Sequence, residues 1–294
     1  ELGYIVDVPG FFIDEDKLED LDRVKMIDSL VRVLQENYIR ILVFPLWRKF
    51  ISPEEKYYLE QSSIILLDGG LMRLVSLIAI VEKLLGILKT KPGEVEVAVW
   101  GADNSIGQLW VEFLAPYLNY LVIGAKDITA LERLRDKTLY DTGLSCYVTT
   151  DLDQCLDNKD VVILGTIPQM WESSDKNRII IFSSGLSHEY HMMQQKDLSG
   201  ILIESGWPSF SPDLAISNDL EPWDHIGVLE ANLFIVDELY RDIIMNYPLN
   251  IKNIHKIEEI LTKYSVDYNG MVSNNEVLTY DGFRRLYFGN CLDK

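Results

Sequence analysis

The chain has 294 residues, of which 48% are hydrophobic and 25% are charged, and its formal net charge at pH 7 is −19. This length and composition are sufficient to bury a sizeable core and predict two compact units. The strong negative charge argues against nucleic acid or an anionic membrane surface as a partner, because both require basic patches.

Residues 1–90 predict a small α/β domain that ends at the boundary Thr90-Lys91-Pro92-Gly93. Its expected elements are the strand Gly3–Ile13, the helix Leu18–Glu36, the strand Ile39–Phe44, a helix starting at Ser52-Pro53, the strand Ser63–Leu67 and the helix Leu71–Leu88. This last segment is the longest apolar run, but Arg73, Glu82 and Lys83 interrupt it, so a buried helix is expected and no membrane span. A homo-oligomer stays open, because this helix is apolar enough to form an interface if it is not wholly buried.

Residues 91–212 alternate regularly between short apolar runs and helical patterns. The expected strands are Val95–Trp100, Tyr120–Gly124, Cys146–Thr149, Val161–Gly165, Arg178–Ser183 and Ile201–Glu204, and the helices between them are Ser105–Leu118, Ile128–Lys137 and a short one around Leu152–Leu156. Runs of Val, Ile and Leu between helices are typical of a parallel sheet covered on both faces. The segment is therefore predicted to be a doubly wound, Rossmann-like α/β domain.

Residues 213–294 change in character. Ile226–Met245 and Ile251–Lys263 have helical patterns, and Asn274–Phe288 is polar and aromatic. These residues predict a C-terminal helical segment that packs back on the other domains. The three cysteines, Cys146, Cys155 and Cys291, show no C-x-x-C spacing, so a reduced, cytoplasmic compartment is expected.

The segment Val95–Gln108 has the order strand, glycine turn and helix start, with Gly101 and Gly107 at the two ends of a polar loop. A helix N-terminus presents free N–H groups and the positive end of a dipole, so it favours a phosphate. The loop is not a full G-x-G-x-x-G fingerprint, because Asp103 or Asn104 stands where the middle glycine belongs. The alternative is that both glycines serve only the turn and the helix packing of a sheet that binds nothing.

Two neighbouring features favour a dinucleotide. The second strand of such a fold ends about 20 residues after the glycines, and its tip reads the ribose. Here Lys126 follows the strand Tyr120–Gly124, and a cation suits the 2′-phosphate of NADP, with Arg133 or Arg135 as possible helpers. The strand Asp160–Thr166 ends in small residues, as expected below a nicotinamide ribose. NADP is therefore the predicted cofactor, and NAD stays open.

Four segments resemble a known family: GADNSIG, LVIGAKDITALERLRD, TTDLDQCLDNKDVVILGT and IESGWP. They are similar to the Rossmann half of the long-chain acyl-(acyl carrier protein) reductases and, more loosely, to shikimate-dehydrogenase-like and ornithine-cyclodeaminase-like domains, over about Glu94–Pro208. The resemblance implies NADPH with its carboxamide end near Thr166 and reduction of an acyl thioester. The reductase cysteine has no counterpart at Ile226–Leu229, so only a general NADP-dependent reductase is implied. The expected cofactor-binding residues are Gly101, Ala102, Asn104, Ser105, Ile106, Gly107, Lys126, Gly165 and Thr166.

Candidate catalytic residues follow the strand Arg178–Ser183, near the carboxyl ends of the strands, where such sheets bind ligands. His188 or His191 is a candidate general acid for a carbonyl oxygen, with Tyr190 as a second donor. The alternative is that both histidines lie on an exposed loop. Their H-x-x-H spacing lacks a third ligand in sequence, so no metal site is predicted.

Two functions follow from these residues. The first is an NADP-dependent oxidoreductase that reduces a small-molecule or acyl carbonyl substrate held between the Rossmann domain and the Glu1–Lys89 unit. The second is a Rossmann-like protein that has lost catalysis and serves as a binding or assembly module. The second is motivated by the missing cysteine and by Asp103, whose carboxylate would repel a nearby pyrophosphate unless it points away.

Overall fold

The structure is a computed structural model that describes residues 20–44, 51–88, 94–168, 178–183, 200–209, 220, 222, 224–274 and 276–292. The chain divides into two compact units, Glu1–Asp68 and Gly69–Lys294. The predicted domain boundaries at residues 90 and 212 do not coincide with this division, because the long apolar helix and the C-terminal elements pack within the second unit.

In the first unit, helices alternate with two short parallel strands: α1 (Asp20–Glu36), β1 (Ile41–Val43), α3 (Pro53–Gln61) and β2 (Ile65–Leu67). Ser52 starts α3 with a capping box, in which its hydroxyl accepts from the Glu55 N–H at 3.2 Å and the Glu55 carboxylate accepts from the Ser52 N–H at 2.7 Å. Buried side chains of α1 and α3 form the core. The predicted alternation is confirmed for these residues, whereas the predicted strand Gly3–Ile13 lies outside the described part.

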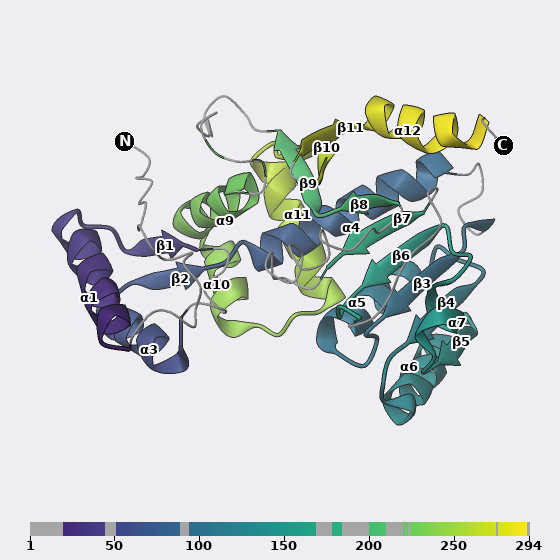
Figure 1. Ribbon diagram of the computed structural model, residues 1–294, viewed down its shortest axis with the longest axis horizontal. Helices are drawn as coiled ribbons and strands as arrows, with labels where there is room; N and C mark the ends of the chain where they lie inside the picture. Colours follow the sequence, from purple (N-terminus) through teal and green to yellow (C-terminus); the bar gives the residue numbers. More distant parts are fainter. Residues whose placement is uncertain are drawn as a thin grey trace. The chain divides into compact units, whose positions relative to one another are not determined.

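The second unit is built on a six-stranded parallel sheet with the order β5-β4-β3-β6-β7-β8. Its strands are β3 (Val97–Trp100), β4 (Leu121–Gly124), β5 (Cys146–Thr149), β6 (Val161–Leu164), β7 (Ile179–Phe182) and β8 (Ile201–Ile203). Figure 1 shows them side by side. When these six strands are numbered along the chain, their order in the sheet is 3-2-1-4-5-6, which is the order of the doubly wound Rossmann fold. The predicted fold class is therefore confirmed.

Three helices connect the first four of these strands: α5 (Ser105–Leu114), α6 (Ile128–Thr142) and α7 (Leu152–Leu156). Helices α5 and α6 pack on one another, while α7 packs across β3, β4 and β5. Right-handed crossovers put α5 and α6 on one face of the sheet and put α7, on the return path to β6, on the other. The core below α7 includes Trp100 and Phe182. Because both faces are covered, the strands are apolar at nearly every position.

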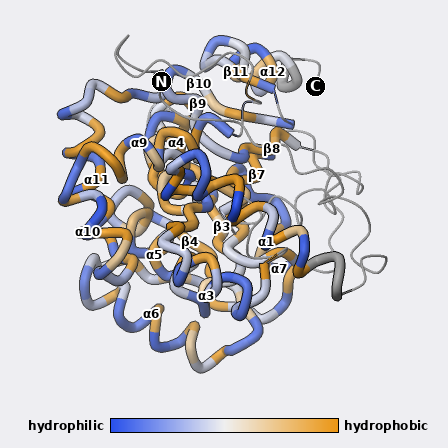
Figure 2. The backbone as a smooth tube through the Cα atoms, turned by 90° about the vertical axis from the view of Figure 1, so that its left-hand side faces the viewer, coloured by the Kyte–Doolittle hydropathy of each residue, from blue (hydrophilic) through white to orange (hydrophobic). Residues whose placement is uncertain are grey.

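Helix α4 (Gly70–Leu88) has 19 residues, most of them apolar and buried, and Figure 2 shows hydrophobic residues along it and along the central strands. It packs on α9 (Asp224–Val236) and on the strands β9 (Ser205–Ser209) and β10 (Asp267–Ser273). The prediction of a buried helix for this segment is confirmed. Within the described residues, no helix is both long and apolar enough to cross a membrane.

The N-terminus of α4 is capped by a carboxylate from a distant part of the chain. Glu230 of α9 is 2% exposed. Its two carboxylate oxygens accept hydrogen bonds from the N–H of Gly69 at 3.1 Å and from the N–H of Met72 at 3.0 Å. Because the first N–H groups of a helix have no partner within the helix, Glu230 satisfies two donors that are buried in the core.

Strands β9, β10 and β11 (Glu276–Thr279) form a three-stranded antiparallel sheet. A single residue, Glu204, separates β8 from β9, and its N–H donates to the Val272 carbonyl at 2.9 Å. The chain therefore passes from the parallel sheet into the antiparallel one without a loop. The prediction that residues 213–294 are helical is wrong for β10 and β11 and holds for α11 (Ile251–Lys263) and α12 (Tyr280–Leu292). The sequence of β10, DYNGMVS, contains residue types that are depleted in strands, so pairing with β9 decides its conformation.

The predicted helix Ile226–Met245 is interrupted at Asp237, between α9 and α10 (Glu238–Asn246). The Asp237 side chain is 5% exposed and caps α10 by accepting from the Tyr240 N–H at 3.0 Å. Its second oxygen accepts from Lys263 Nζ at 2.8 Å and from the Tyr264 hydroxyl at 3.3 Å. The apolar pattern continues across this break, so periodicity alone cannot reveal it.

This cap predicts a pH-dependent stability. Burial alone would raise the pKa of Asp237, but the hydrogen bonds from Lys263 and the Tyr240 N–H outweigh it and hold the pKa below its ordinary value. The stabilisation is therefore present above the unfolded-state pKa of about 4 and is lost as the pH falls through the folded-state pKa. Asp237→Asn keeps the cap and loses the charge, and we expect it to lower the free energy of unfolding by about 1–2 kcal/mol at pH 7. Urea unfolding from pH 7 to pH 3 should show this difference shrink below about pH 4. A difference that stays constant over this range would contradict the assignment.

Candidate functional site

The site begins at the turn that follows β3. Gly101 has a φ of +83°, in the left-handed region that glycine adopts without strain. The N–H groups of Gly101 and Ala102 both donate to the Gly124 carbonyl at the end of β4, at 2.7 and 3.1 Å. Both loop residues are buried. The turn is thus fixed to the neighbouring strand, and α5 starts directly above the carboxyl ends of β3 and β4.

Close packing explains both glycines of the loop. A Cβ atom on Gly107 would overlap the Gly101 carbonyl oxygen and approach the Ala102 Cα at 2.7 Å. A Cβ atom on Gly101 would lie 2.6 Å from Thr166 Oγ1 and 2.7 Å from Thr166 N. The first turn of α5, the end of β3 and the end of β6 therefore meet through backbone atoms, which is what a glycine-rich dinucleotide turn requires of its first and last glycines.

Asn104 stands at the position of the missing middle glycine. Its side chain connects the loop between β3 and α5 with the residues that follow β6. It is the N-cap of α5, and its Oδ1 accepts from the Gly107 N–H at 2.8 Å. Its Nδ2 donates to the Gly165 carbonyl and to Thr166 Oγ1, both at 2.9 Å. Asparagine is a preferred N-cap residue, so its cap role could be predicted from the sequence. The link to residues 165 and 166 has no sequence signal, because it spans about 60 positions.

The first turn of α5 still has donors for a ligand. Within the described part of the chain, no hydrogen bond is recorded for the N–H groups of Ser105 and Ile106, whereas those of Gly107 and Gln108 are bonded to Asn104. The side chain of Ser105 is exposed. Two adjacent N–H groups at the positive end of a helix dipole make a site for an anion such as a phosphate.

Lys126 and Asp127 lie just beyond β4, beside the glycine turn, because Trp100 and Gly124 are paired in the sheet. Lys126 is exposed, and among the described residues no ion pair or hydrogen bond is recorded for its side chain. Asp127 is occupied, since its Oδ1 accepts from the N–H groups of Thr129 and Ala130 as the N-cap of α6. Of the two candidate helpers, Arg135 is paired with Asp136 at 2.8 Å and Arg133 is exposed on α6.

Gly165 and Thr166 directly follow β6, on the other side of the turn. The Gly165 N–H donates to the Trp100 carbonyl at 2.8 Å, and a Cβ atom on this residue would lie 3.2 Å from the same oxygen. Thr166 is exposed. The structure thus brings together eight of the predicted cofactor-binding residues around one turn, with Lys126 at its flank.

The predicted catalytic residues His188, Tyr190 and His191 lie outside the described residues, so their roles stay predictions. Among the residues that the structure describes, no group of three histidine, cysteine, aspartate or glutamate side chains is arranged to hold a metal ion. His225 is buried in α9, and its ring lies 4.5 Å from the ring of Trp207. Burial lowers the pKa of His225 from its ordinary value.

Cys146 and Cys155 are buried. Burial raises the pKa of Cys146 to about 11 and that of Cys155 to about 12. Both thiols are therefore protonated at neutral pH, and neither has the thiolate character of a nucleophile.

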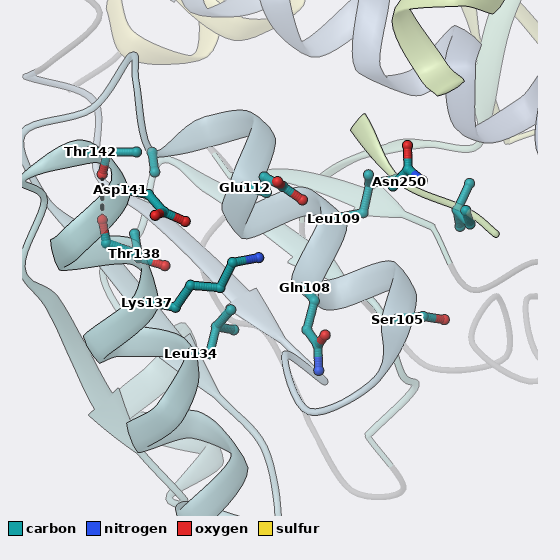
Figure 3. A pocket seen from close by; sticks show the side chains of 12 residues that line it. Ser105, Gln108, Leu109, Glu112, Leu134, Lys137, Thr138, Asp141, Thr142 and Asn250 are labelled. Atoms are coloured by element: carbon teal, nitrogen blue, oxygen red, sulfur yellow. Dashed lines mark hydrogen bonds between the residues drawn. The ribbon is translucent and has the colours of Figure 1, made fainter. Parts of the chain in front are cut away.

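A separate groove of about 380 Å³ lies between α5 and α6, with Leu249 and Asn250 at one end. Leu109 and Leu134 contribute apolar side chains, and Figure 3 shows Lys137 extending from α6 toward α5. Ser105 belongs both to this groove and to the first turn of α5, but Gly101, Lys126 and Thr166 do not line it. The groove therefore runs between the two helices and reaches the first turn of α5 only at Ser105 and Gln108.

Comparisons with known proteins identify no family: no family model matches the chain, and no curated protein matches its sequence. The predicted resemblance to the acyl reductases thus finds no support from a family model.

Solved structures resemble the chain only distantly. L-tryptophan dehydrogenase from Nostoc punctiforme is 14% identical, with a TM-score of 0.42, over 92% of this chain and 72% of that one. The 5-ketofructose reductase of Gluconobacter sp. strain CHM43 is 13% identical, with a TM-score of 0.31, over 67% of this chain and 64% of that one. Ornithine carbamoyltransferase from Pyrococcus furiosus is 13% identical, with a TM-score of 0.28, over 53% of this chain and 57% of that one. The chain spans less than two thirds of the last two proteins.

Proposed function

We propose that the protein is an NADP-dependent oxidoreductase that reduces a carbonyl group of a small-molecule or acyl substrate. One observation carries this proposal: a Rossmann strand order whose central turn combines tightly packed glycines with two N–H groups, at the start of α5, that have no hydrogen-bond partner among the described residues. In open α/β sheets, ligands bind at the carboxyl ends of the strands where the strand order reverses, which is between β3 and β6 here.

The pyrophosphate of the dinucleotide would be held by the Ser105 and Ile106 N–H groups and by the Ser105 hydroxyl. A phosphate at this position gains from the dipole of α5 and from direct donors. The two halves of the dinucleotide then extend to opposite sides of the turn. The adenosine half would lie over β4, beside Lys126, and the nicotinamide half over β6, beside Thr166.

The choice of NADP over NAD rests on the residues after β4. An enzyme that uses NAD needs a carboxylate that accepts the ribose hydroxyls, but one oxygen of the Asp127 carboxylate, Oδ1, already accepts two backbone N–H groups at the start of α6. Lys126 is exposed and bears a positive charge suited to a 2′-phosphate. NAD remains the second candidate cofactor.

The nicotinamide would deliver a hydride to the substrate carbonyl, and a protein group would donate the proton to the carbonyl oxygen. His188, His191 and Tyr190 are the proposed donors, because they come within ten residues of the end of β7 in the sequence. Thr166 is a further donor at the carboxyl edge of the sheet.

The second candidate function, a binding or assembly module without catalysis, is favoured by Asp103. Its side chain is half-buried within the loop, and no partner for its carboxylate is recorded among the described residues. A carboxylate within a few Å of a pyrophosphate opposes binding by about 1 kcal/mol or more.

A titration of protein fluorescence with NADPH and NADH separates the two functions. We expect saturable binding of NADPH, and no binding of either cofactor up to millimolar concentration would refute the enzyme. We expect Lys126→Ala to weaken NADPH binding about tenfold, because it removes a charged contact to the 2′-phosphate, and to leave NADH binding unchanged. Lys137→Ala is the matched control, since this exposed lysine lines the separate groove. Equal loss of NADPH binding in both variants would contradict the role of Lys126.

A further inference from the structure

The orientation of the Asn104 amide is determined by two backbone groups. The Gly107 N–H can only donate, so the atom that faces it must be Oδ1. The Gly165 carbonyl can only accept, so the atom that faces it must be Nδ2. Reversing the amide would put a donor against a donor and an acceptor against an acceptor. The two partners leave one arrangement.

This arrangement sets the polarity of the Thr166 hydroxyl. Because Nδ2 also points at Thr166 Oγ1 from 2.9 Å, the hydroxyl oxygen must accept from Asn104, and its hydrogen is directed elsewhere. Thr166 is exposed, so this hydrogen is available to a ligand at the carboxyl edge of the sheet. Gly101 leaves the space that the hydroxyl occupies, since a Cβ atom there would lie 2.6 Å from Oγ1.

We propose that Asn104 is a positioning residue that presents the Thr166 hydroxyl as a hydrogen-bond donor, so that this end of the site selects a ligand group with an acceptor oxygen. The inference rests on the NADP site proposed above. In that site the nicotinamide half extends over β6, and Thr166 donates to an oxygen of its ribose or carboxamide. Asn104 therefore serves two parts of the ligand: it caps the helix that holds the pyrophosphate, and it orients the donor for the nicotinamide half.

Binding of two ligands by four proteins, with Thr166→Ser as a control, tests the proposal. The ligands are NADPH and 2′-phospho-ADP-ribose, which lacks the nicotinamide. The proteins are the parent, Thr166→Val, Asn104→Ser and the double variant. We expect Thr166→Val to weaken NADPH binding about threefold to tenfold, as for one lost hydrogen bond, and to leave binding of 2′-phospho-ADP-ribose unchanged. Thr166→Ser retains the hydroxyl and should bind NADPH as the parent does.

Asn104→Ser separates the two roles of the asparagine. Serine caps a helix nearly as well as asparagine, so the thermal midpoint should stay close to that of the parent. Its side chain is too short to reach Thr166, so NADPH binding should weaken by about the same factor as in Thr166→Val. If Asn104 acts through Thr166, the double variant should bind NADPH no more weakly than Thr166→Val alone.

These measurements distinguish a failure of the proposed NADP site from a failure of the positioning role of Asn104. If the parent binds neither ligand, the proposed function is wrong and the positioning role falls with it. If the parent binds both ligands and Thr166→Val binds NADPH as tightly, the NADP site stands and the role of Thr166 is refuted. The positioning role would be refuted if the double variant lost as much NADPH affinity as the two single variants together. It would also be refuted if Asn104→Ser weakened the binding of NADPH and of 2′-phospho-ADP-ribose equally.

Discussion

Replacing Glu230 with alanine is expected to lower the free energy of unfolding by about 3–5 kcal/mol. The carboxylate accepts from the N–H groups of Gly69 and Met72 at the start of α4, and both Glu230 and Met72 are buried. Its removal leaves two buried donors without their acceptor, each of which costs about 1–3 kcal/mol, and leaves a cavity at the contact between α4 and α9.

Urea unfolding followed by circular dichroism measures this change. Glu230→Gln keeps one acceptor oxygen and should have a smaller effect, of about 1–2 kcal/mol. Glu112→Ala is a matched surface control on α5, because this glutamate is exposed and should change the stability by less than about 0.5 kcal/mol. A loss of less than about 1 kcal/mol in Glu230→Ala would show that the cap contributes little.

Gly107→Ala should destabilise the protein by about 2–3 kcal/mol and, if the turn holds a dinucleotide, also reduce the binding of NADPH. The added methyl group would overlap the Gly101 carbonyl oxygen and press on the Ala102 Cα. These neighbours are backbone atoms, so no side-chain rotation can relieve the clash. Helix α5 must move away from β3, and the donors of Ser105 and Ile106 move with it.

Gly86→Ala provides the matched control within the same unit. Gly86 lies inside α4, and a Cβ atom there would meet nothing within 4 Å. Alanine is favoured over glycine inside a helix, so this variant should be more stable than the parent by about 0.5–1 kcal/mol. Opposite changes in the two variants would establish that the cost at Gly107 comes from close packing. A parent-like stability of Gly107→Ala would contradict the close approach of α5 and β3.

The parallel sheet could be predicted because each of its strands has a recognisable pattern in its own short segment of sequence. Most strands of this sheet are short runs of buried residues, and β3, β6 and β7 are apolar throughout. The antiparallel sheet depends on distant partners instead. Strands β9 and β10 contain Pro208, Asn269 and two glycines, which disfavour strands, and they pair only because α4 and the end of β8 bring them together.

The candidate site divides in the same way. Gly101, Gly107 and Lys126 could be recognised from their spacing to the strands, and their surroundings follow from the strand order. The hydrogen bonds of Asn104 with Gly165 and Thr166 could not be predicted from the sequence. They depend on how closely the loop after β3 and the loop after β6 approach each other in the folded sheet.

The direct passage from β8 into β9 also bears on self-association. An edge strand with free N–H and C=O groups is a template for strands of other molecules, and long, open edges promote ordered aggregates. At one edge of the six-stranded sheet, β10 packs against β8, and the Glu204 N–H bonds to Val272. At the other edge, β5 has four residues. A foreign strand therefore finds a covered edge on one side and a short one on the other, which limits the growth of intermolecular sheets from this fold.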